Sequence, residues 1–105
     1  MDTVPVGDMS KWKSNPFEPV IRNGKIYGRG AEDNGQSLIA SMYAAKAIID
    51  SGKIPDYNYS IAFVSDEETG SKYGIQHLAN LGIFNKEDLI LVPDHGTPQG
   101  KLKSD

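Results

Sequence analysis

The chain has 105 residues, enough for one small domain, and its 38% hydrophobic and 24% charged residues are ordinary for a soluble globular protein. Its 14 acidic and 11 basic residues give a formal net charge of −3 without a basic block, which argues against nucleic acid or an anionic membrane as a partner. Cysteine is absent, so thiolate metal sites are excluded. No apolar run reaches the roughly 20 residues of a membrane span, and we expect a cytoplasmic protein.

The first 24 residues are dense in proline, glycine and asparagine, which predicts an extended loop with at most a short strand at Val20-Ile21. Trp12 and Phe17 are large apolar side chains in this loop, and we expect both to pack on a neighbouring surface. A helix is predicted from Gly35 to Ser51, because its apolar residues recur at steps of four, three and four and therefore share one face. Gly52 supplies its C-terminal stop.

Two apolar stretches further along the chain predict strands. Residues 57–64 are rich in aromatic and branched side chains and residues 89–92 are continuously apolar, as in strands that are buried on both faces. Between them a second helix is predicted from about Ser71 to Leu81, with Ile75 and Leu78 facing inward. This alternation predicts an α/β layered fold with a largely parallel or mixed sheet flanked by helices.

Acidic residues gather where the predicted strands end, in the loop before the first helix, and at the start of the chain. They are Asp2, Asp33, Asp66, Glu67, Glu68 and Asp94. Ligands of open α/β sheets bind outside the carboxyl ends of the strands, so the acids that follow the two strands are predicted to lie at the functional edge, and Asp33 can reach it from its loop. Oxygen ligands alone favour a hard cation such as magnesium or manganese.

Structural roles without a metal remain open for the same acids. Asp66, Glu67 and Glu68 could mark a helix N-terminus, where negative charge is favourable. Asp33 could be the N-cap of the first helix, and Asp94, two residues before a glycine, could be a turn residue. Their coincidence at one sheet edge favours the metal site.

Several separated motifs resemble one enzyme family. They are Asp2-Thr3-Val4-Pro5-Val6-Gly7-Asp8, then Trp12, Pro16-Phe17-Glu18-Pro19, Gly24-Lys25-Ile26-Tyr27-Gly28-Arg29-Gly30-Ala31 with Asp33, and Asp66-Glu67-Glu68-Thr69-Gly70-Ser71. In order and spacing they resemble the M20 metallopeptidases, which include succinyl-diaminopimelate desuccinylase, acetylornithine deacetylase, aminoacylase and carboxypeptidase G2. The resemblance covers nearly the whole chain.

The resemblance implies a site for two zinc ions, or for cobalt in their place. Asp33 would bridge the two ions, while Glu68 and Asp94 would each bind one of them. Glu67 would be the general base, and Asp2 would be the acid of a His-x-Asp pair that orients a histidine ligand. The implied reaction is cleavage of the amide bond of an N-acyl amino acid or small peptide, as in a desuccinylase or deacetylase.

Both histidine ligands of the family fall outside this chain, since one would precede Met1 and the other would follow Asp105. We therefore expect residues 1–105 to be a partial catalytic domain that is inactive alone, from a parent that is a homodimer through a dimerisation domain absent here. His77 is expected on the surface of the second helix, and His95 is a weaker ligand candidate. The alternative is a non-catalytic folded module that keeps the scaffold without a competent metal site.

Overall fold

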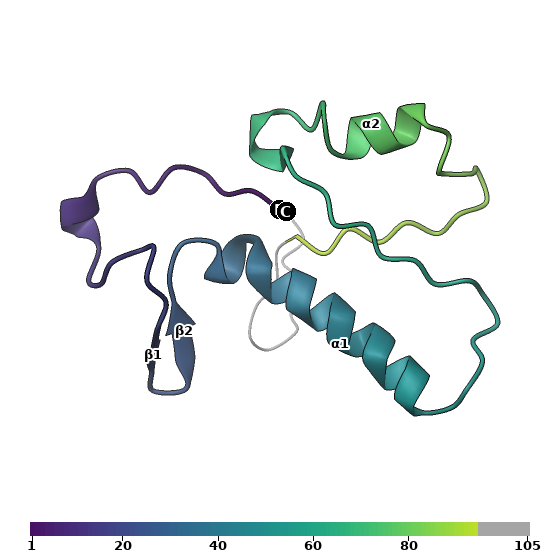
Figure 1. The fold of residues 1–105 in the computed structure, drawn as a ribbon, viewed down its shortest axis with the longest axis horizontal. Coiled ribbons are helices and arrows are strands. Elements are labelled where there is room, and N and C mark those ends of the chain that lie inside the picture. Colours follow the sequence, from purple (N-terminus) through teal and green to yellow (C-terminus); the bar gives the residue numbers. More distant parts are fainter. Residues whose placement is uncertain (95–105) are drawn as a thin grey trace, which may run out of the picture.

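The computed structural model describes residues 1–94. Its elements in chain order are a 3-10 turn η1 (Met9–Lys11), strands β1 (Val20–Arg22) and β2 (Lys25–Tyr27), an irregular turn η2 (Ala31–Gln36), helix α1 (Ser37–Asp50), a 3-10 turn η3 (Glu67–Thr69) and helix α2 (Ile75–Asn80). Figure 1 shows α1 and α2 set apart, joined by long extended stretches of chain. None of the described helices is both long and apolar enough to cross a membrane.

Strands β1 and β2 form an antiparallel hairpin in which Val20 lies opposite Tyr27. The turn residues Asn23 and Gly24 have φ values of 52° and 72°, the left-handed conformations that a two-residue hairpin turn requires. The strand predicted at Val20-Ile21 is therefore confirmed. The second strand was not predicted, although an Asn-Gly pair between apolar residues is the signal that identifies such a hairpin.

Helix α1 confirms the predicted helix and begins two residues later than expected. The N-cap position of α1 is Gln36, three residues after Asp33, so the interpretation of Asp33 as the N-cap is wrong. Half-buried positions along the helix include Leu38, Ala45 and Ile48, whereas Met42 and Ile49, which were expected on the same face, are exposed.

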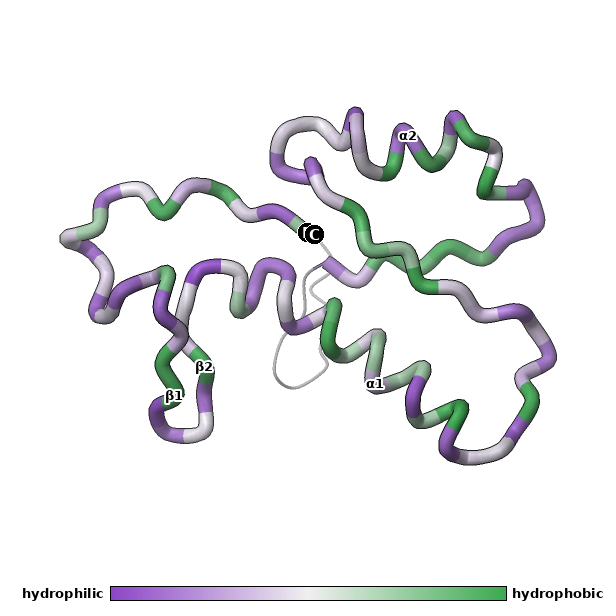
Figure 2. The backbone as a smooth tube through the Cα atoms, in the orientation of Figure 1, coloured by the Kyte–Doolittle hydropathy of each residue, from purple (hydrophilic) through white to green (hydrophobic). Residues whose placement is uncertain are grey.

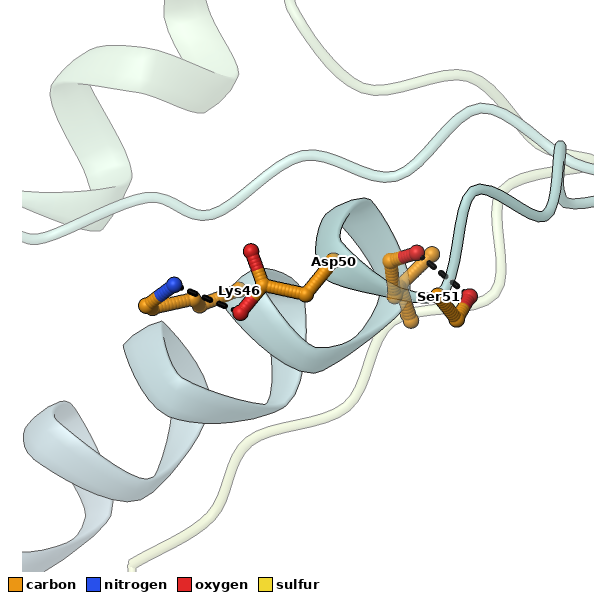
Figure 3. Close-up of polar contacts among 4 residues, drawn as sticks. Lys46, Asp50 and Ser51 are labelled. Carbon is orange, nitrogen blue, oxygen red and sulfur yellow. Dashed lines mark hydrogen bonds and ion pairs between the residues drawn. The ribbon is translucent and has the colours of Figure 1, made fainter.

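The C-terminal end of α1 is closed by polar contacts (Figure 3). The Ser51 hydroxyl donates to the Ile48 carbonyl at 2.7 Å, and Gly52 takes a φ of 65° that ends the helix as predicted. Lys46 and Asp50 form an ion pair at 2.5 Å, one turn apart. Both side chains are mostly exposed, so the pair adds little to stability.

The predicted parallel sheet is the main correction. Residues 57–64 and 89–92 are extended, but neither stretch pairs as a strand, and the sheet within residues 1–94 is the two-stranded hairpin alone. Tyr57 is 86% exposed and Leu89 is 99% exposed. A strand of a parallel sheet needs at least one neighbouring strand and cover on both faces, and the described residues supply neither. Figure 2 shows hydrophobic colouring in the second half of the first stretch and along the second.

Helix α2 is shorter than the predicted helix, which was to begin near Ser71. Leu78 is half-buried as expected, whereas Ile75 is exposed. His77 is exposed on α2, which confirms its predicted place on the surface. Gly82 follows the helix with a φ of 70°.

The described chain is open and has no apolar core of its own. Its radius of gyration is 16.6 Å, against about 13 Å for a compact domain of this length. Its accessible surface is 9336 Å2, where a compact monomer would expose roughly 5,800 Å2. Trp12 is half-buried as expected, but Phe17 is 69% exposed, so that part of the prediction is wrong. The loops are held by hydrogen bonds as well as by packing.

Candidate functional site

The start of the chain is bound to the acidic loop by the carboxylate of Asp2. One of its oxygens accepts the backbone N–H of Glu67 at 3.1 Å, and the other accepts the backbone N–H of Glu68 at 3.2 Å. Asp2 is half-buried. The two glutamates therefore have their main chain fixed while their carboxylates stay available for other partners.

Asp66 shapes the same loop from within. Its backbone has a φ of 74°, and its carboxylate accepts the Thr69 hydroxyl at 2.5 Å and the Tyr73 backbone N–H at 2.7 Å. The Thr69 hydroxyl first, and then the Tyr73 N–H, hold the pKa of Asp66 below its usual range. Asp66 is thus occupied by contacts that order the loop. Glu67 and Glu68 open the three-residue turn η3 and do not cap α2.

The pKa of Glu68 is affected by three other acidic residues. Its side chain is half-buried, and this burial is the largest cause of a raised pKa. The nearby carboxylate of Asp33 raises the pKa of Glu68 next, followed by that of Glu67, a hydrogen bond with Asp33, and the charge of Asp2. Acids from three separate segments therefore surround one carboxyl group.

The loop that carries Asp33 is folded back on itself. The Gly35 N–H donates to the Gly30 carbonyl at 2.9 Å, and a Cβ at Gly35 would lie only 2.4 Å from that oxygen. The peptide between Asp33 and Asn34 is cis. The Asn34 side-chain amide donates to the Pro93 carbonyl at 2.9 Å, which connects this loop to the segment that ends in Asp94.

A second layer of contacts holds the N-terminal segment against the same loop. The Arg29 guanidinium lies 5.0 Å from the centre of the Trp12 ring and donates to the Pro5 carbonyl at 3.2 Å. The Trp12 indole N–H donates to the Val6 carbonyl at 2.9 Å. Sequence reasoning assigned no role to Arg29 or Asn34. Only the Gly-Arg-Gly run drew attention to Arg29, and no pattern singles out Asn34.

The charges of Asp33, Glu67 and Asp2 all act on Glu68, and Asp2 is hydrogen-bonded to the main chain of both glutamates. Asp94 is exposed and is linked to the group only through its neighbour Pro93. Within residues 1–94 no three His, Cys, Asp or Glu side chains are placed to hold a metal ion. The metal-ligand roles therefore stay predictions, and the suggestion for His95 lies outside the described residues.

Comparison with known proteins identifies the family to which this chain belongs. Residues 1–104 match the model of a family described as peptidase family M20/M25/M40. An uncharacterized metallohydrolase of Methanocaldococcus jannaschii is 54% identical over 105 residues, which cover 97% of this chain and 26% of that protein. Another, of Methanococcus maripaludis, is 47% identical over 105 residues, 97% of this chain and 25% of that protein.

A succinyl-diaminopimelate desuccinylase of Nitrosospira multiformis is 48% identical over 69 residues, which cover 64% of this chain and 18% of that protein. The chain spans about a quarter of the length of the two metallohydrolases. No solved structure matches it.

Proposed function

Because this chain belongs to the peptidase family M20/M25/M40, we propose that it carries the metal-site segment of a metal-dependent amide hydrolase. Its relatives include two proteins named metallohydrolases and one named a succinyl-diaminopimelate desuccinylase, which supports an N-acyl amino acid or small peptide as substrate. The observation that carries the proposal is the gathering of Asp2, Asp33 and Glu67 around Glu68, since it concentrates negative charge at one point.

The chemistry of these donors fits a divalent cation. Carboxylates that repel one another are stabilised by a cation between them. Burial is the largest cause of the raised pKa of Glu68, and repulsion from Asp33 is the next. The ion pair found within residues 1–94 joins Lys46 to Asp50, so it does not neutralise these acids. In our proposal Asp33, Glu68 and Asp94 are the residues that would hold zinc or cobalt ions.

When bound, such ions would polarise the amide carbonyl and lower the pKa of a water molecule. Glu67 is the residue that then moves the proton, from the oxygen of the attacking water to the nitrogen of the leaving amine. Its side chain is exposed, and its backbone N–H is held by Asp2, so the carboxylate is positioned without being occupied. Asp66 is excluded from this task because its carboxylate is already engaged with Thr69 and Tyr73.

The test uses the full-length protein that contains this chain and a panel of N-succinyl and N-acetyl amino acids. We expect hydrolysis that is lost on treatment with a chelator and restored by zinc or cobalt. Glu67→Gln should lower turnover by roughly a hundredfold or more, while Glu18→Gln, at an exposed acid in the N-terminal loop, should not. Metal-loaded protein that cleaves none of these amides would favour the non-catalytic module instead.

A further inference from the structure

We propose that Asn34 is a positioning residue, whose side-chain amide ties the Asp33 loop to the Pro93-Asp94 segment and so sets how closely two acids approach. This inference rests on the proposed function, because it concerns the same site. Asn34 touches no reacting atom in our scheme. It acts through its neighbour Asp33 and through the partner segment that it holds.

The geometry gives the amide a defined direction. Asn34 Nδ2 lies 2.9 Å from the Pro93 carbonyl oxygen, across 59 residues of sequence. A carbonyl oxygen only accepts, so the group that faces it must be the NH2 of the side chain. Pro93 has no N–H of its own to offer in return. The contact therefore needs a donor at position 34.

The segment held by Asn34 has little else to fix it. Residues 89–92 have no strand partner within the described chain, and Leu89 is 99% exposed. Asp94 follows this stretch directly, so its position relative to Asp33 depends on what restrains Pro93. The Asn34 amide is adjacent to Asp33 in the chain and provides that restraint.

The side-chain oxygen of Asn34 indicates that this residue does more than stabilise the loop. Asn34 Oδ1 is covered and has no hydrogen-bond partner within residues 1–94. A covered acceptor without a donor costs free energy, and an apolar side chain of similar shape would avoid that cost. The N–H donor is what the asparagine contributes.

The experiment compares full-length wild type with Asn34→Ala and Asn34→Leu, first without metal. Hydrogen–deuterium exchange at Gly35, whose N–H donates to the Gly30 carbonyl in the same loop, should rise about fivefold in both variants, as one lost hydrogen bond implies. Zinc titration of the same samples should then show one ion bound roughly 10- to 100-fold more weakly. Asn80→Ala, at an exposed asparagine of α2, is the matched control and should change neither measurement.

Unchanged exchange in both Asn34 variants would overturn the inference, and so would faster exchange with unaltered zinc affinity. If Asn34→Ala does not fold, Asn34→Leu still decides, because it keeps the approximate size of the side chain and removes the donor without adding a charge. The two proposals fail separately. Wild type that binds no metal contradicts the proposed function, whereas wild type that is active while the exchange stays unchanged contradicts the role of Asn34.

Discussion

The carboxylate of Asp2 accepts the backbone N–H of Glu68 at 3.2 Å, although the two residues are 66 positions apart in sequence. Its second oxygen accepts the N–H of Glu67 in the same way. Hydrogen bonds to a charged acceptor are stronger than neutral ones, so this pair fixes the acidic loop against the start of the chain. By the family resemblance Asp2 would orient a histidine ligand that precedes Met1. In the structure its carboxylate accepts the backbone N–H groups of Glu67 and Glu68.

Removing this acceptor should loosen the loop that carries the general base. We expect Asp2→Ala to lower kcat of the full-length enzyme by roughly tenfold or more, since both N–H donors lose their partner. Asp2→Asn keeps one acceptor oxygen and should lie between wild type and Asp2→Ala. Steady-state kinetics beside NMR of the Glu67 and Glu68 amides checks this, with Asp8→Asn at an exposed turn as the control. Amides that exchange as slowly in Asp2→Ala as in wild type would contradict it.

Glu67 and Glu68 should have separable roles. Glu68→Gln is expected to lower the metal content of the full-length enzyme, because an amide oxygen is a poorer ligand than a carboxylate. Glu67→Gln should keep its metal and lose turnover by roughly a hundredfold or more. Metal analysis and rate are measured on both variants. Metal lost from Glu67→Gln but retained by Glu68→Gln would mean that the two roles are reversed.

The lowered pKa of Asp66 predicts how the stability of its loop depends on pH. Its folded-state pKa lies below the unfolded value of about 3.9, so its contacts stabilise the loop above that pH, and the stabilisation is lost as pH falls through the folded-state pKa. Thr69→Val removes the first cause of the shift and should raise the pKa of Asp66 toward its ordinary value. Thr69→Ser keeps the hydroxyl and should not. An NMR titration of the Asp66 carboxyl group decides, and an equal pKa in wild type and Thr69→Val would contradict the assignment.

Position 74 has no room for a side chain, because the backbone at Ser65 passes close to it. A Cβ at this position would lie 2.0 Å from the Ser65 carbonyl oxygen, just before the acidic loop. Gly74→Ala should therefore cost about 1–3 kcal/mol in stability and also lower metal occupancy, because Ser65 must move. Gly52→Ala, where a φ of 65° makes alanine unfavourable but no atom lies within 4 Å, should lose stability and keep its metal. Thermal unfolding and metal analysis separate the two, and full metal content in Gly74→Ala would contradict the role of this approach.

The 105-residue chain expressed alone should be inactive. The acids that the structure gathers offer oxygen ligands only, and such ligands select zinc poorly over manganese. We therefore expect no measurable hydrolysis of N-succinyl or N-acetyl amino acids and weak divalent-ion binding by calorimetry. Tight zinc-selective binding would reveal a nitrogen ligand, with His95 as the first suspect.

Sequence reasoning was most successful where local chemistry decides the structure. The period of α1 and its stop at Gly52 follow from short-range patterns. It failed where structure depends on distant partners, as for the two apolar stretches that were predicted to be strands. Asn34 was missed for the same reason, because its hydrogen bond to Pro93 joins residues that no periodicity relates.

The two unpaired apolar stretches also have a consequence for biosynthesis. Residues 57–64 carry no charge and are rich in β-forming side chains, so while they emerge from the ribosome they can pair with copies of themselves. Asp56 and Asp66 flank this stretch, and Asp88 and Asp94 flank the other. Charges in such places act as gatekeepers against aggregation. Asp66 and Asp94 can therefore protect the nascent chain from self-association before the loop and the proposed site have formed.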